Sequence, residues 1–193
     1  MRVAIKKLIK ASIDTKQALL ENEQLILTID SIVKMVVPAF NNGQRVHFCG
    51  NGGSAADAQH LAAEFSGRFY KNRRALPSEA LHCNTSYLTA VANDYSFEEI
   101  YSRLVDGIME KGDVLIGLST SGNSKNIVKA FETARAKGII TVGFTGEDGG
   151  ALRELSDHLI NIPSSVTPRI QEAHILVGHI ICELVEAAIF FED

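Results

Sequence analysis

The segment Val46–Asp57 constrains the fold of this chain more than any other part of its sequence. The residues VHFC predict a short strand, GNGG predicts a tight turn, and Ser54 is expected to open a helix. A strand that passes through a glycine-rich turn into a helix directs backbone N–H groups and the positive end of the helix dipole toward one place. This arrangement favours the binding of an anion such as phosphate.

From residue 45 onward, segments typical of strands and of helices alternate along the chain. Two of the strands are almost continuously apolar, as expected for strands that are covered on both faces. The alternation predicts an α/β fold of three layers, with a doubly wound, mostly parallel sheet of five strands. The expected strands are 46–49, 79–83, 113–118, 139–144 and 158–162, and the expected helices between them are 54–66, 85–93, 97–109, 124–137 and 150–156.

The two ends of the chain are predicted to be helical. Residues 3–42 form an N-terminal helical region with a break at Glu21–Asn22, and Pro38 is expected to kink its second helix. Thr167 and Pro168 are expected to start a final helix that runs to about residue 190. We expect a single domain over 1–193, in which 1–44 pack in an oligomer and 45–193 form the α/β core. Capping boxes are predicted at Ser54–Asp57 and Ser96–Glu99.

The composition excludes several classes of protein. A net charge of −4 leaves no basic field for nucleic acid. No apolar run reaches the ~18 residues of a membrane span, so we expect no membrane partner. The 3 cysteines are odd in number and scattered, which favours a reduced, cytoplasmic protein. Cys49 and Cys83 are expected to be buried thiols.

A second polar loop follows the strand predicted at 113–118. Ser119–Ser124 has the sequence STSGNS, and its hydroxyl and backbone N–H groups can hold a phosphate without a lysine. A polar turn with a helix cap is the alternative for such a loop taken alone. Because ligands of open α/β sheets bind beyond the carboxyl ends of the strands, two such loops favour phosphate binding. Neither loop matches the Walker A or the dinucleotide-binding pattern.

His60 and Glu64 lie four residues apart, so they share a face of the helix that the first loop starts. An imidazole and a carboxylate together suit zinc or a similar divalent metal. The alternative is a hydrogen bond within the helix. The position of the pair just after the glycine loop favours a functional role.

The final helix carries Gln171, His174 and His179 among apolar residues. We expect His174 to be a hydrogen-bonded core residue. Gln171 and His179 are eight residues apart, which separates their Cα atoms by about 12 Å along the axis. The two could serve one metal only with difficulty, unless two chains contribute or their roles differ.

Two further polar groups are candidates for substrate contact. Asn93 and Asp94 end a predicted helix, where a cap or turn role is the alternative. The basic run of Arg68, Lys71, Arg73 and Arg74 is typical of a solvated face. Arg68 is its nearest member to His60 and Glu64, and we expect it to touch the substrate.

Taken together, four segments resemble the phosphoheptose isomerases, a family with the sugar isomerase (SIS) fold. They are CGNGGSAADAQH followed by Glu64, the sequence AND at 92–94, STSGNS at 119–124 and RIQEAH at 169–174. The resemblance covers nearly the whole chain. It implies a homotetramer with active sites at subunit interfaces. It also implies conversion of sedoheptulose 7-phosphate into D-glycero-D-manno-heptose 7-phosphate, for lipopolysaccharide or another surface polysaccharide.

The resemblance also implies a site. One zinc ion per subunit would be bound by His60, Glu64, Gln171 and His179. The expected substrate-binding residues are Asn51, Gly52, Gly53, Ser54, Glu64, Arg68, Asn93, Asp94, Ser119, Thr120, Ser121, Ser124 and Gln171. For ketose-to-aldose isomerisation through an enediol, we expect Glu64 to act as the base and His179 as the acid. Some members carry an aspartate where this chain has Pro168, so no role is transferred to that position.

Two rival interpretations use the same fold. One is a non-catalytic binding protein similar to the factor that associates with the bacterial replication initiator. Binding proteins of that kind lack a glutamate at the position of Glu64, so its presence favours an enzyme. The other is a sugar-phosphate sensor or another sugar-phosphate isomerase. The set of His60, Glu64, Gln171 and His179 disfavours a pure sensor but does not name the sugar.

Overall fold

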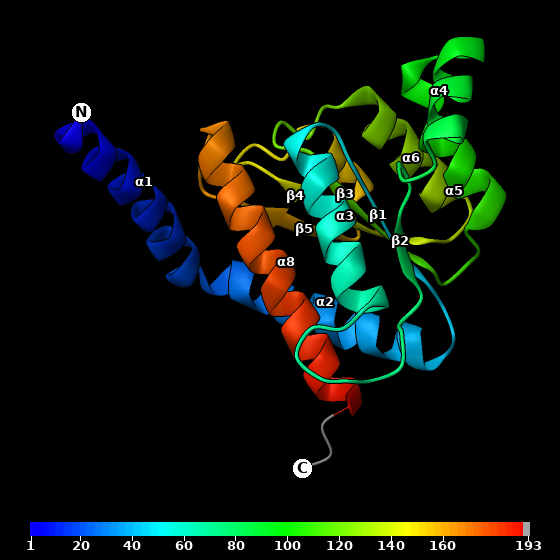
Figure 1. The fold of residues 1–193 in the computed structure, drawn as a ribbon, viewed down its shortest axis with the longest axis horizontal. Helices are drawn as coiled ribbons and strands as arrows, with labels where there is room; N and C mark the ends of the chain where they lie inside the picture. Colours follow the sequence, from blue (N-terminus) through cyan, green and yellow to red (C-terminus); the bar gives the residue numbers. More distant parts are fainter. Residues whose placement is uncertain (191–193) are drawn as a thin grey trace.

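The computed structural model describes residues 1–190 and contains the predicted five-stranded sheet (Figure 1). All neighbouring strands pair in parallel, in the order β2-β1-β3-β4-β5. The strands are β1 (Val46–Gly50), β2 (Ser78–Ala80), β3 (Val114–Leu118), β4 (Ile140–Thr145) and β5 (His158–Asn161).

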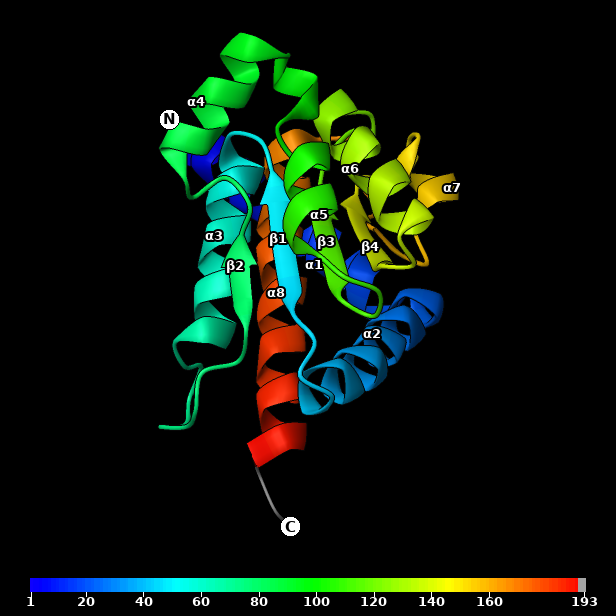
Figure 2. The ribbon, with the colours of Figure 1, turned by 90° about the vertical axis from the view of Figure 1, so that its right-hand side faces the viewer.

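Helices cover both faces of this sheet, which gives the predicted three layers (Figures 1 and 2). Side chains alternate across the strands: Val114 and Ile116 face one hydrophobic core, and Leu115 faces the other. The first core is shared with α2 (Glu23–Asn41), α3 (Gly53–Ser66) and α8 (Thr167–Phe190). The second is shared with α4 (Thr85–Asp94), α5 (Ser102–Ile108), α6 (Lys125–Ala136) and α7 (Leu152–Leu155).

The N-terminal helix α1 (Arg2–Leu20) extends away from the rest of the chain (Figure 1). Arg169 links it to α8 by donating from Nη1 to the carbonyl oxygen of Leu8 at 2.7 Å. The break predicted at Glu21–Asn22 is confirmed, because Asn22 caps α2 by accepting a hydrogen bond from the Leu25 N–H. Apolar side chains of α1 are exposed, including Val3, Ile5, Leu8, Ile9 and Ile13.

Several predicted boundaries were wrong. Neither capping box forms, since α3 begins one residue early with Gly52 as N-cap and Ser96 makes no side-chain cap. The helix predicted at 97–109 is divided into a short 3₁₀ helix, Phe97–Glu99, and α5. The strand predicted at 79–83 ends at Ala80, where the chain leaves the sheet edge.

The strand order brings the two polar loops together. β1 and β3 are neighbours, so the loops that follow them leave the same edge of the sheet side by side. The sequence of connections reverses direction between these two strands, and ligands of such sheets bind at this point. α8 is long and apolar enough to cross a membrane, but it packs against α2, α3 and β4 as a core helix does.

Candidate active site

The first loop, Gly50–Gly53, turns the chain from β1 into α3. A Cβ atom on Gly50 would collide with the backbone carbonyl of Ser54, and Gly52 has a φ of 55°. Both positions therefore favour glycine. The buried Tyr101 hydroxyl donates to the Gly50 carbonyl oxygen at 2.5 Å and fixes the turn.

A reciprocal amide pair joins the two loops. Asn51 Nδ2 donates to Asn126 Oδ1 at 2.9 Å, and Asn126 Nδ2 donates back to Asn51 Oδ1 at 2.8 Å. Asn126 lies in the first turn of α6 and is only 3% exposed. Because these bonds occupy much of the Asn51 side chain, its backbone is the part most available to a ligand.

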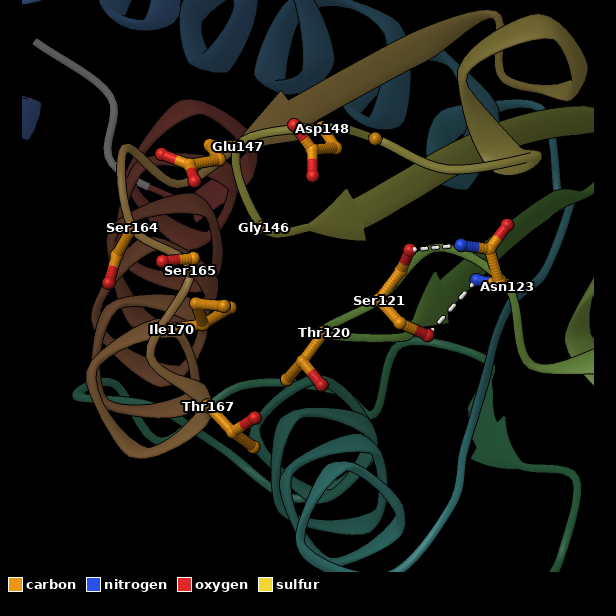
Figure 3. A pocket seen from close by; sticks show the side chains of 11 residues that line it. Thr120, Ser121, Asn123, Gly146, Glu147, Asp148, Ser164, Ser165, Thr167 and Ile170 are labelled. Atoms are coloured by element: carbon orange, nitrogen blue, oxygen red, sulfur yellow. Dashed lines mark hydrogen bonds between the residues drawn. The ribbon is translucent and has the colours of Figure 1, made fainter.

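The second loop lines a cavity of about 250 Å³ (Figure 3). Its hydroxyl groups are held in place, since Ser119 Oγ and Ser124 Oγ lie 3.0 Å apart and Ser121 Oγ accepts from the Asn123 N–H. The other walls come from the loops after β4 and β5 and from the first turn of α8. The lining residues are Thr120, Ser121, Asn123, Gly146, Glu147, Asp148, Gly149, Ser164, Ser165, Thr167 and Ile170.

A cluster of potential metal ligands forms between α3 and α8. His60 Nε2 lies 3.1 Å from Glu64 Oε1 and 3.0 Å from His179 Nε2. One ligand atom from each of the three residues lies within 4.8 Å of the others. A side-chain contact within α3 thus exists, but a third ligand from a different helix joins it.

The donor set of this cluster fits a divalent metal such as zinc. Imidazole nitrogens and a carboxylate oxygen are common zinc ligands, and neighbouring donors around a tetrahedral zinc lie roughly 3.3 Å apart. The two separations from His60 Nε2, 3.1 Å to Glu64 Oε1 and 3.0 Å to His179 Nε2, are close to that value. His60 is exposed and the other two are half-buried, so the cluster is open to a small molecule.

Two neighbours of the cluster were missed by sequence reasoning. Burial raises the pKa of Asp57, while the nearby His60 and His179 act in the opposite direction. Asp57 precedes His60 by three residues, a helical spacing that could have revealed it. The Phe69 ring lies 5.9 Å from the His179 ring, and no sequence pattern indicated this contact.

Gln171 lies apart from the cluster within one chain. A Cβ on Gly53 would meet Gln171 Nε2 at 2.8 Å, which places this amide beside the first turn of α3. His60 is seven residues farther along α3, a rise of about 10 Å. The structure thus brings three of the four predicted ligands together and puts Gln171 next to the glycine loop.

Comparisons with known proteins agree with this geometry. The SIS domain family model matches residues 10–146. The chain is 50% identical to phosphoheptose isomerase of Clostridium acetobutylicum over 192 residues, covering 100% of this chain and 98% of that protein. It is 52% identical to that of Aneurinibacillus thermoaerophilus over 186 residues, covering 96% and 94%. The chain belongs to the phosphoheptose isomerase family.

A solved phosphoheptose isomerase has the same fold. The structure from Neisseria gonorrhoeae superposes with a TM-score of 0.90 at 36% sequence identity, covering 96% of this chain and 98% of that one. The fold predicted from sequence, including the helical N-terminal region, is therefore confirmed.

Of the remaining predicted site residues, Arg68, Asn93 and Asp94 are exposed and Ser54 is buried. Asn93 and Asp94 are exposed at the end of α4, where Asn93 Nδ2 donates to Asp94 Oδ1 at 2.9 Å. Arg68 Nη1 donates to the Tyr70 carbonyl oxygen at 3.3 Å, in the loop after α3. Ser54 is buried in the first turn of α3.

Three other expectations had mixed outcomes. His174 is a buried core residue whose Nε2 lies 3.1 Å from the Thr145 carbonyl oxygen, as expected. Cys49 is buried, but Cys83 is exposed, so that prediction was wrong. Arg73 was assigned to a solvated face, yet its side chain is 3% exposed and paired with Glu186.

Proposed function

We propose that this protein isomerises sedoheptulose 7-phosphate to D-glycero-D-manno-heptose 7-phosphate, in heptose synthesis for lipopolysaccharide or another surface polysaccharide. Membership of the family makes the chain an isomerase. The convergence of His60, Glu64 and His179 carries the proposal, because it brings an acid on α8 close to a base on α3, the helix that the glycine loop starts.

The reaction moves a proton from C1 to C2 of the sugar through an enediol. We assign Glu64 as the base that takes and returns this proton, and His179 as the acid that protonates oxygen or assists ring opening. Zinc, when bound by His60, Glu64, Gln171 and His179, would supply Lewis-acid polarisation of the carbonyl group. A carboxylate that is bound tightly to a metal is a weak base, so Glu64 needs a loose contact to serve both purposes.

The two loops are proposed to hold the phosphate end of the substrate. Backbone N–H groups and hydroxyls at the switch point suit a phosphate, and binding there orients the reacting carbons. The residues assigned to the phosphate are Asn51, Gly52, Gly53, Ser54, Ser119, Thr120, Ser121 and Ser124. Arg68, Asn93, Asp94 and Gln171 are assigned to the rest of the sugar.

We also propose a homotetramer with sites at subunit interfaces, built from a single domain over 1–193 and acting in the cytoplasm. The exposed apolar side chains of α1 support an oligomer, since a soluble monomer rarely exposes a large apolar patch. The separation of Gln171 from His179 supports a shared site. A second chain could bring its own Gln171 to the His60 cluster.

The test is an isomerase assay on sedoheptulose 7-phosphate, with the purified protein before chelation, after chelation and after zinc is restored. We expect turnover that is lost on chelation and recovered with zinc. Turnover that persists after complete metal removal would contradict the zinc assignment alone. No turnover under any condition would favour the non-catalytic binding protein.

A further inference from the structure

A buried ion pair lies just beyond the metal-ligand cluster. Glu186 on α8 and Arg73 in the loop after α3 are joined by a contact of 2.8 Å between Arg73 Nε and Glu186 Oε2. The two side chains are 1% and 3% exposed. Removing either side chain would leave the other charge buried without a partner, which is strongly destabilising.

Glu186 also organises the loop backbone. Its Oε1 accepts from the N–H groups of Tyr70 at 2.7 Å and Lys71 at 2.9 Å. Its Oε2 accepts from the Phe69 N–H at 3.0 Å. One carboxylate therefore fixes three consecutive peptide groups of the loop, and Phe69 among them contacts the His179 ring.

Arg73 connects this loop to the end of α3. Its Nη2 donates to the carbonyl oxygen of Glu64 at 2.9 Å, and its Nη1 donates to that of Phe65 at 2.8 Å. The last carbonyl groups of a helix have no partner within the helix, so the guanidinium group satisfies them and holds the final turn. That turn carries the Glu64 side chain.

We propose that Glu186 and Arg73 are positioning residues that hold Glu64 of α3 and His179 of α8 at their mutual separation. The inference rests on the roles proposed above for Glu64 and His179. The pair connects the two helices just beyond the cluster, about two turns after His179 on α8. Arg73 fixes the backbone of Glu64, and Glu186 fixes the loop that packs on His179. Arg73 acts through backbone carbonyl groups, and Glu186 through backbone N–H groups and Arg73.

The main test is Arg73→Lys, which keeps the charge opposite Glu186 but loses the planar fork that reaches the α3 carbonyls. Outer-shell partners of metal ligands change metal affinity or activity by ~10–100-fold. We expect kcat to fall by that factor with KM unchanged, because the phosphate loops are not altered. We expect the zinc dissociation constant, measured by chelator competition on the metal-free protein, to rise by a similar factor.

Two control variants separate positioning from general stability. Arg135→Lys changes an arginine that donates to the Glu154 carbonyl oxygen at the end of α7, far from the cluster. Val105→Ala removes buried volume from the second core. We expect both controls to keep the wild-type kcat and zinc affinity per folded molecule, although Val105→Ala lowers the melting temperature.

The outcomes are distinct. An Arg73→Lys protein that is less stable but has wild-type kcat and zinc affinity would overturn the positioning role. If Arg73→Lys does not fold, Glu186→Gln is measured in the same way, with hydrogen exchange at residues 69–71 reporting the loop. A Glu64→Gln protein with wild-type turnover would instead contradict the proposed catalytic site, independently of Arg73.

Discussion

His60 and His179 face each other through their Nε2 atoms at 3.0 Å, although they are 119 residues apart in the sequence. The contact exists because α3 and α8 pack side by side against the same face of the sheet. A Cβ atom on Gly178 would collide with the Leu61 side chain, so the absence of a side chain there allows close approach beside the two histidines. The candidate metal site is therefore a property of helix packing.

Glu64→Gln and His179→Gln are expected to abolish turnover while leaving the protein folded and the proposed tetramer intact. Glutamine keeps the size of glutamate but cannot take a proton, and in place of histidine it can neither give nor take one at neutral pH. Turnover is measured on sedoheptulose 7-phosphate, and the oligomer by size-exclusion chromatography with light scattering. A Glu64→Gln protein with a near-normal rate would show that the base is another residue.

Replacing both Ser119 and Ser121 with alanine is expected to raise KM and to leave kcat nearly unchanged. The two hydroxyl groups lie in the loop assigned to the phosphate, away from the reacting carbons, so their loss weakens binding in ground and transition states alike. Ser119 Oγ is 3.0 Å from Ser124 Oγ. Ser124→Ala alone is therefore compared with the double variant, because it removes the neighbour of the Ser119 hydroxyl but keeps the hydroxyl groups of Ser119 and Ser121. Steady-state kinetics check this, and an unchanged KM would place the phosphate elsewhere.

Most of the fold could be predicted because the signals are local. Runs such as Val114–Leu118 read as covered strands, and glycine turns between strands and helices mark the connections. The predicted helix boundaries were wrong where another residue was a stronger local signal for the start of the helix. Gly52, with its positive φ, is the N-cap of α3, two residues before the serine that the capping pattern had selected.

The site was predictable only in part. The loops and the spacing of His60 and Glu64 are visible in the sequence, but the contact with His179 depends on how two distant helices pack. The burial of Arg73 could not be predicted, because a basic run is usually solvated. The partner of Arg73, Glu186, lies 113 residues away in the sequence. Pairing across such a separation leaves no periodic signal in one sequence.

Asn126→Asp is expected to weaken the link between the two loops. The carboxylate can still accept from Asn51 Nδ2, but Asn51 Oδ1 loses the donor that now lies 2.8 Å away. An unsatisfied buried acceptor costs about 1–3 kcal/mol, and the added negative charge disfavours a nearby phosphate. We expect a lower free energy of unfolding in urea and a higher KM. Wild-type values of both would show that the pair does not hold the loops.

Stability is expected to fall as the pH is lowered from 6.5 toward 4, with His174 as a main contributor. Its side chain is fully buried, and burial lowers its pKa from 6.5 to about 4 although the Thr145 carbonyl accepts a hydrogen bond from it. In this window the unfolded chain binds a proton that the folded chain does not, so protonation favours unfolding. Below the folded-state pKa the loss from this one residue reaches about 3 kcal/mol.

The measurement is urea unfolding of wild-type and His174→Gln proteins at several pH values between 7 and about 4.5. Glutamine can still donate to the Thr145 carbonyl but does not titrate, so the free energy of unfolding should depend less steeply on pH in the variant. Burial also lowers the pKa values of His47, His82 and His158, so part of the slope should persist. Equal slopes in the two proteins would show that His174 is protonated in the folded state as readily as in the unfolded chain.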